Sequence, residues 1–143
     1  MLINKEVLYN MKNNINYNDK NELTSLCETV REFIMQKRYC ECEKLITSAM
    51  MKYPHAPEPH NLMGIHLETK GDHLTAMKHF RAAWALDPTY LPARYNMSQY
   101  GDLFCKEHKN AYDETDCPKD NDSNLYKTEY DKNGIGHIVK RTQ

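Results

Sequence analysis

The stretch GDHLTAMKHFRAAWALDP, residues 71–88, has the pattern of a single amphipathic helix. Asp72 is placed to cap its start, and Asp87 followed by Pro88 ends it. The apolar residues recur at helical spacing, at Leu74, Met77, Phe80, Ala83 and Trp84. An isolated helix of this length is marginally stable in water. The stretch therefore predicts neighbouring helices against which its apolar face packs.

Four further helices are expected around this stretch, joined by connections of a few residues. Three precede it, at about residues 19–37, 39–53 and 57–70, and one follows, starting near Tyr90 and carrying Leu103 and Phe104. The first has the spacing of a capping box at Asp19 to Glu22, and Gly71 closes the third. Short connections favour antiparallel neighbours, so the sequence predicts an all-α fold.

The helix pairs repeat with a period of 34 residues. Pro88 corresponds to Pro54, Ala83 corresponds to Ala49, and the large residue Phe80 corresponds to Ile46. A fixed period with matching residue sizes indicates stacked, similar units rather than an irregular bundle.

In these residues the chain resembles the tetratricopeptide repeat family, whose signature is W-x₂-L-G-x₂-Y, then A-x₃-F, then P. The matching residues here are His60, Met63, Gly64, Leu67, Ala76, Phe80 and Pro88. The resemblance covers about residues 20–108, is best over 57–90, and departs from the signature at His60. It implies a short α-solenoid of antiparallel helix hairpins, with about two repeats and a capping helix.

The resemblance also implies that the first helices of successive repeats line a concave groove that binds a peptide of a partner protein. By analogy with the family, the groove residues are Cys27, Arg31, Asn61, Ile65, Tyr95 and Gln99. The polar ones suit hydrogen bonds to a peptide backbone or carboxylate, and Ile65 and Tyr95 suit an apolar side chain. The alternative is that these residues form an ordinary solvated helix face. The expected function is a protein–protein interaction adaptor.

Two polar regions flank the predicted helical domain, residues 19–109. Residues 1–18 are Asn-rich and are expected to form a polar arm. Residues 110–143 contain the acidic stretch AYDETDCPKDNDSN, residues 111–124, which is expected to be a linker. Runs of alternating character around Asn133 and Gly134 then predict a β-hairpin, with strands at about 125–130 and 135–140. Because a lone hairpin is marginally stable, the alternative function is a self-association module that uses this tail or the N-terminal arm.

The composition argues against several classes of partner and location. The formal net charge of −1 gives no overall field to attract nucleic acid or an anionic membrane. No stretch approaches the roughly 18 apolar residues of a membrane-spanning helix, and the N-terminus lacks the apolar run of a secretory signal. Five cysteines fit reduced thiols better than a disulfide framework. The sequence predicts a cytoplasmic protein with a protein or peptide partner, and a homodimer is possible.

Catalytic motifs are absent from the sequence, which has no Gly-rich phosphate loop, no G-x-S-x-G and no HExxH. The chain is therefore not expected to be an enzyme or to carry a cofactor. The remaining candidates for a metal site are Cys105 and His108, three apart on the expected last helix, together with Cys117. Three ligands fall short of a closed four-ligand zinc site, so a metal-dependent sensor or enzyme is the least favoured alternative.

Overall fold

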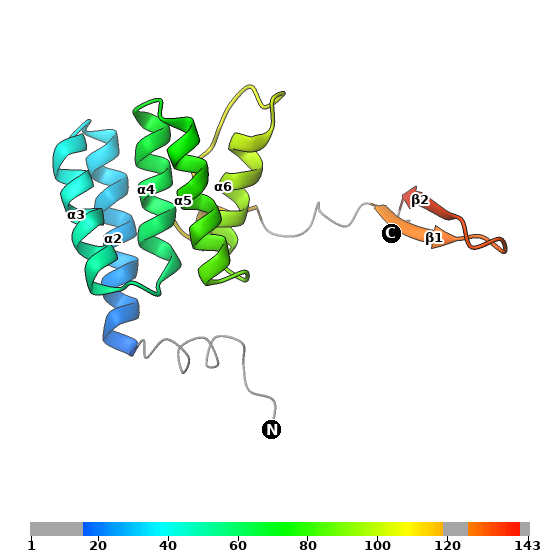
Figure 1. Cartoon of the computed structure of the whole chain (residues 1–143), viewed down its shortest axis with the longest axis horizontal. Helices are drawn as coiled ribbons and strands as arrows, with labels where there is room; N and C mark the ends of the chain where they lie inside the picture. Colours follow the sequence, from blue (N-terminus) through cyan, green and yellow to red (C-terminus); the bar gives the residue numbers. More distant parts are fainter. Residues whose placement is uncertain (1–15, 119–125, 141–143) are drawn as a thin grey trace.

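The computed structural model describes residues 16–118 and 126–140. This part of the chain is mostly helical and also contains a small antiparallel sheet (Figure 1), which confirms the all-α class. Its elements are α2 (Tyr17–Met35), α3 (Tyr39–Lys52), α4 (Pro57–Thr69), α5 (His73–Leu86), α6 (Leu91–Gly101), the 3₁₀ turn η1 (Glu114–Asp116), β1 (Tyr126–Tyr130) and β2 (Gly136–Lys140). Most of the expected N-terminal arm lies outside the described residues.

The helix boundaries follow local capping. Helix α2 begins one turn earlier than a capping box at Asp19 and Glu22 would allow, because Asn16 is the N-cap. The Asn16 side chain accepts from the backbone N–H of Asp19 at 3.0 Å, and the Asp19 carboxylate accepts from that of Asn16 at 3.1 Å. The cap of α5 is the expected one, since Asp72 accepts from the N–H of Thr75 at 3.2 Å. Gly71, with φ of 83°, follows α4 as expected.

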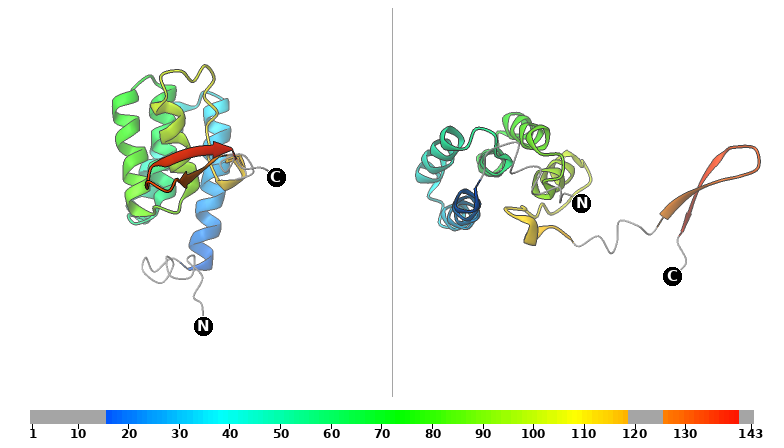
Figure 2. Two further views of the ribbon diagram at one scale, coloured as in Figure 1. Left: turned by 90° about the vertical axis from the view of Figure 1, so that its right-hand side faces the viewer. Right: turned by 90° about the horizontal axis from the view of Figure 1, so that it is seen from below.

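The helices form two layers. Each helix contacts the next one along the chain, and α2 also contacts α4, as α4 contacts α6. Figure 2 shows the result from below, with α2, α4 and α6 on one side and α3 and α5 on the other. One continuous face is therefore built from every second helix.

The contact between α4 and α5 is the closest in the core. A Cβ atom on Gly64 would lie 2.5 Å from a ring carbon of Phe80, so only glycine allows this approach. Ala76, Phe80 and Ala83 form the fully buried row of α5. Leu74, which we expected on the same face, is 70 % exposed, because it lies about 200° around the helix from Ala76.

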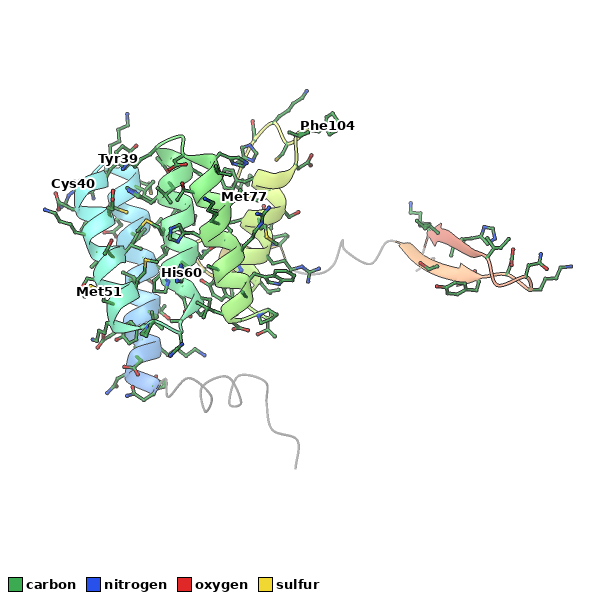
Figure 3. All side chains as sticks on the ribbon, viewed as in Figure 1. Tyr39, Cys40, Met51, His60, Met77 and Phe104 are labelled. Carbon is green, nitrogen blue, oxygen red and sulfur yellow. The ribbon has the colours of Figure 1, made fainter. Side chains whose placement is uncertain are left out.

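Helix α6 ends at Gly101 and does not reach Leu103 and Phe104, contrary to the sequence prediction. The side chain of Asp102 accepts from the N–H of Phe104 at 2.8 Å, and this local turn replaces the next helical turn. Leu103 and Phe104 are almost fully exposed, and Phe104 points away from the helices (Figure 3). Residues 102–109 are thus an irregular loop.

The predicted hairpin is confirmed, with Tyr126 opposite Lys140 and Tyr130 opposite Gly136. Its turn is organised by Asp131, whose carboxylate accepts from the N–H groups of Asn133 and Ile135, and Gly134 adopts a φ of 77°. Among the described elements, the two strands contact each other and no helix. None of the described helices combines the length and apolar character that crossing a bilayer requires.

Candidate functional site

A segment that follows α6 lies against the layer of α2, α4 and α6. We call residues 110–117 the return segment, because after the loop 102–109 the chain runs back across that face (Figure 2). Ala111 is fully buried and Tyr112 is 8 % exposed. The acidic linker was expected to begin at residue 110, but residues 110–117 are docked, since polar side chains of the helices hold them.

Two asparagines hold the backbone of the return segment at Ala111. The Nδ2 groups of Asn61 and Asn96 both donate to the carbonyl of Ala111, at 2.9 and 2.8 Å. The N–H of Ala111 donates to Oδ1 of Asn96 at 2.8 Å, and Asn96 also donates to Oδ1 of Asn61 at 2.9 Å. Both asparagines are fully buried.

This arrangement satisfies the complete backbone of one peptide residue. An extended residue turns its N–H and its C=O to the same side, and the amide of Asn96 offers one acceptor and one donor to match them. Because these bonds involve only the main chain, they recognise an extended conformation and not a particular side chain. A buried backbone group without such a partner would cost about 1–3 kcal/mol.

Arg31 on α2 binds the acidic end of the return segment. Its Nη2 lies 2.7 Å from Oδ2 of Asp116 and 3.2 Å from Oδ2 of Asp113. Its guanidinium carbon is 4.9 Å from the centre of the Tyr112 ring, in cation–π geometry. Burial raises the pKa of Asp113, but the hydrogen bonds from Thr115 and the charge of Arg31 outweigh it, so that pKa is lowered overall.

The Tyr112 side chain joins the main hydrophobic core, in the cluster that contains Cys27 and Ile65. Burial is the main reason that the pKa of Tyr112 is raised. Beside it, the hydroxyl of Tyr100 donates to the side chain of Asn110, and the Tyr100 ring stacks on His108 at a centroid distance of 4.6 Å. The return segment is thus fixed by an aromatic anchor as well as by its backbone.

The structure brings Arg31 and Asn61 together on one face, where both contact the return segment. Cys27 and Ile65 are buried in the core, and burial raises the pKa of Cys27 to about 12. Tyr95 and Gln99 are half-buried on α6, and the Gln99 amide accepts from Sγ of Cys105 at 3.5 Å.

Sequence reasoning missed Asn96, which contacts Ala111 more fully than any other side chain. The 34-residue period leads from Asn61 to Tyr95, whereas the structural partner of Asn61 is one residue further along. A second asparagine 35 residues after Asn61 was the signal that could have found it.

Two polar atoms near η1 are buried without a hydrogen-bond partner, the carboxylate Oε2 of Glu58 and the hydroxyl of Tyr90. Burial raises the pKa of Glu58 to about 7, and the negative charges of Asp87 and Glu114 act in the same direction. Burial also raises the pKa of Tyr90 well above its usual value. This end of the site therefore has hydrogen-bonding capacity that the return segment does not use.

The metal-site candidates are not brought into a cluster. Cys105 lies in the loop after α6 and not on a helix, and His108 stacks on Tyr100. Within residues 16–118 and 126–140, no three or more His, Cys, Asp or Glu side chains are arranged to hold a metal ion. The nearest approach of two histidines is at His60 and His79, whose Nδ1 atoms lie 3.1 Å apart.

Comparisons of the chain with protein-family models, with curated proteins and with solved structures found no match. Function is therefore argued from the site itself.

Proposed function

We propose that this chain is an adaptor that binds an extended peptide segment of a partner protein on the face formed by α2, α4 and α6. We call this face the groove face and define its contact residues as Arg31, Asn61 and Asn96. The proposed architecture is a short solenoid of two tetratricopeptide-like repeats with α6 as a capping helix. The approach of Phe80 to Gly64 supports it, because the family signature places a small and a large residue at these positions.

The observation that carries the proposal is the grip of Asn61 and Asn96 on the backbone of Ala111. Side chains that are fully buried and bond to a peptide's main chain are suited to receive an extended segment of any origin. Arg31 adds preference for carboxylates, since charge-assisted hydrogen bonds are stronger than neutral ones. All five cysteines are free, which supports a reducing location such as the cytoplasm.

A displayed library of random peptides tests this function. Because the return segment covers the groove face, selection uses an Asp113→Asn/Asp116→Asn variant, which loses both ion pairs to Arg31. Enriched peptides are then measured by calorimetry against the same variant carrying Asn61→Ala and Asn96→Ala. We expect the affinity of the peptides to fall about tenfold or more, because the variant lacks the two amides that would hydrogen-bond to the peptide backbone at a buried site.

The matched control replaces Asn21, an exposed asparagine on α2, with alanine in the same background. Equal affinity of the selected peptides for the control and for the Asn61→Ala/Asn96→Ala variant would show that the groove face is not their binding site. Failure to enrich any peptide that depends on these two asparagines would remove the proposal.

A second candidate, self-association, is favoured by the hairpin, whose strands contact no helix among the described elements. Its exposed apolar side chains include Tyr130, Ile135 and Ile138. Light scattering at two protein concentrations, on the full chain and on a chain ending at Pro118, tests it. A dimer that is lost on truncation supports self-association, and a monomer in both removes it.

A further inference from the structure

We propose that the return segment is an internal ligand, and that the external partner is an acidic segment of the same pattern that displaces it. This inference rests on the proposed function of the groove face. The pattern is a small residue, an aromatic residue and two carboxylates, in the spacing of Ala111, Tyr112, Asp113 and Asp116.

The contacts of the return segment are those of a bound peptide. Its backbone is held at Ala111 by two asparagines, its aromatic ring is buried, and its carboxylates meet Arg31. Apart from the single turn η1, the segment has no regular structure of its own. Within the segment, Asp113 and Asp116 accept from the N–H groups of Thr115 and Tyr112. Arg31, Asn61 and Asn96 hold it on the groove face, as they would hold a separate peptide.

The connection to α6 allows the segment to leave without loss of a helix. Residues 102–109 form an irregular loop, and Leu103 and Phe104 within it are exposed. Release would break the hydrogen bonds to Ala111, the Arg31 ion pairs and the burial of Tyr112, while the hydrogen bonds of α6 remain. The groove face can thus exchange occupants while the helical layers stay intact.

The chemistry of the partner follows from each contact. Ala111 is fully buried, so a small residue belongs there, and the buried ring of Tyr112 requires an aromatic residue at the next position. Arg31 receives two carboxylates three positions apart, which an acidic segment supplies and a basic one would not.

A tethered segment has an effective concentration in the millimolar range, so an external segment needs additional contacts to displace it. The structure shows where such contacts are available. The Oε2 atom of Glu58 and the Tyr90 hydroxyl are buried without a hydrogen-bond partner, and a hydrogen-bond donor on the external segment would satisfy them.

The test uses a fluorescent synthetic peptide of residues 108–118, with Cys117→Ser to prevent oxidation, and measures its binding to the full chain by fluorescence polarisation. The probe is titrated against the wild-type chain and the Asp113→Asn/Asp116→Asn variant. We expect the variant to bind the peptide about fivefold more tightly, because the wild-type groove face is mostly occupied by its own segment and loss of the Arg31 ion pairs weakens that occupancy. Circular dichroism verifies that each chain is folded.

The matched control is Glu28→Gln/Glu32→Gln, which removes two charges from exposed positions on α2 and leaves the return segment intact. It should bind the peptide as weakly as wild type, which separates release of the segment from a change in net charge. A peptide carrying the two Asp→Asn changes should lose binding to the variant, because Arg31 then has no carboxylate.

Hydrogen exchange on the wild-type chain supplies a second readout. Excess probe peptide should accelerate exchange at the amide of Ala111 in the chain, which is hydrogen-bonded only while the segment is seated. Unchanged exchange at saturating peptide would overturn the proposal.

The remaining outcomes separate this inference from the proposed function. Equal affinity of the peptide for wild type and variant would overturn self-occupancy and leave a peptide-binding groove. If the library-selected peptides bind but the probe does not, the internal-ligand proposal fails and the adaptor function stands. Failure of both sets of peptides removes both. A wild-type dimer in which each return segment binds the groove face of the other copy would overturn the proposal that the segment is a ligand of its own chain.

Discussion

The return segment and the hairpin both follow α6, yet only one of them contacts the helices. Ala111 of the return segment is fully buried, whereas Ile138 of the hairpin is 79 % exposed. The two strands of the hairpin hydrogen-bond to each other along one edge, so part of their backbone is paired without the helices. The backbone of the return segment at Ala111 has no strand partner, and it hydrogen-bonds to the buried side-chain amides of Asn61 on α4 and Asn96 on α6. The return segment therefore docks through the hydrogen-bond partners that the helices offer at Ala111 together with the burial of the Tyr112 ring.

The largest effect is expected from two truncations, one that removes the return segment together with the hairpin and one that removes the hairpin alone. A chain ending at Lys109 should lose about 3 kcal/mol of unfolding free energy, from the burial of Tyr112 and the hydrogen bonds at Ala111. A chain ending at Pro118 lacks the hairpin and should unfold at the same urea concentration as the full chain. Equal stability of the two truncated chains would contradict the structural role assigned to the return segment.

A smaller effect is expected from Gly64→Ala, which tests how α4 positions Asn61. The new methyl group would lie 2.5 Å from the Phe80 ring, and the resulting shift should cost about 1–3 kcal/mol in urea unfolding. Gly101→Ala is the control, because its nearest neighbour would be Cε of Met77 at 3.9 Å. If both substitutions are neutral, α4 and α5 do not approach as closely as described.

Removal of the Arg31 side chain, which binds the acidic end of the return segment, should have a milder consequence. Arg31→Ala breaks the ion pairs to Asp113 and Asp116 at a partly exposed site, which we expect to cost about 1 kcal/mol. The loss should be smaller in 1 M salt, where exposed charges are screened. Arg81→Ala, at an exposed position on α5, is the control. Equal effects of the two substitutions in urea unfolding would contradict an anchoring role for Arg31.

The smallest effect concerns Glu58, whose Oε2 atom is buried without a hydrogen-bond partner. The pKa of Glu58 is raised from 4.5 to about 7, so the folded state holds a proton more tightly than the unfolded chain. Its contribution to stability is present below pH 4.5 and is lost as the pH rises through about 7. Glu58→Gln removes this loss and should stabilise the protein at pH 8 by on the order of 1 kcal/mol, with little change at pH 4.

The measurement is urea unfolding of both chains at pH 4 and pH 8, with Glu28→Gln as the exposed control. Burial lowers the pKa of His60 and His79, which weakens stability as the pH falls below 6.5, but this applies equally to both chains and cancels in the difference. A constant difference at the two pH values would show that Glu58 is not desolvated in the folded protein.

Local signals predicted the helices well and the site only in part. Asp72 and Gly71 mark the junction of α4 and α5 as expected, because capping depends on neighbouring residues alone. The end of α6 was missed, since Leu103 and Phe104 continue an apolar pattern that the turn at Asp102 interrupts. Arg31 and Asn61 were predicted to line a peptide groove, and in the structure both contact residues that lie some 50 to 85 positions away in the chain.

The sequence by itself determined the five described helices, their antiparallel order and the hairpin, through periodicity, capping residues and turn chemistry. Only the tertiary structure decided that residues 110–117, acidic and without helical periodicity, dock on the helices. Their docking depends on Asn61 and Asn96 meeting at one point from two separate helices. Such a meeting leaves no periodic pattern, because a backbone hydrogen bond places no demand on the side chain of the residue it holds.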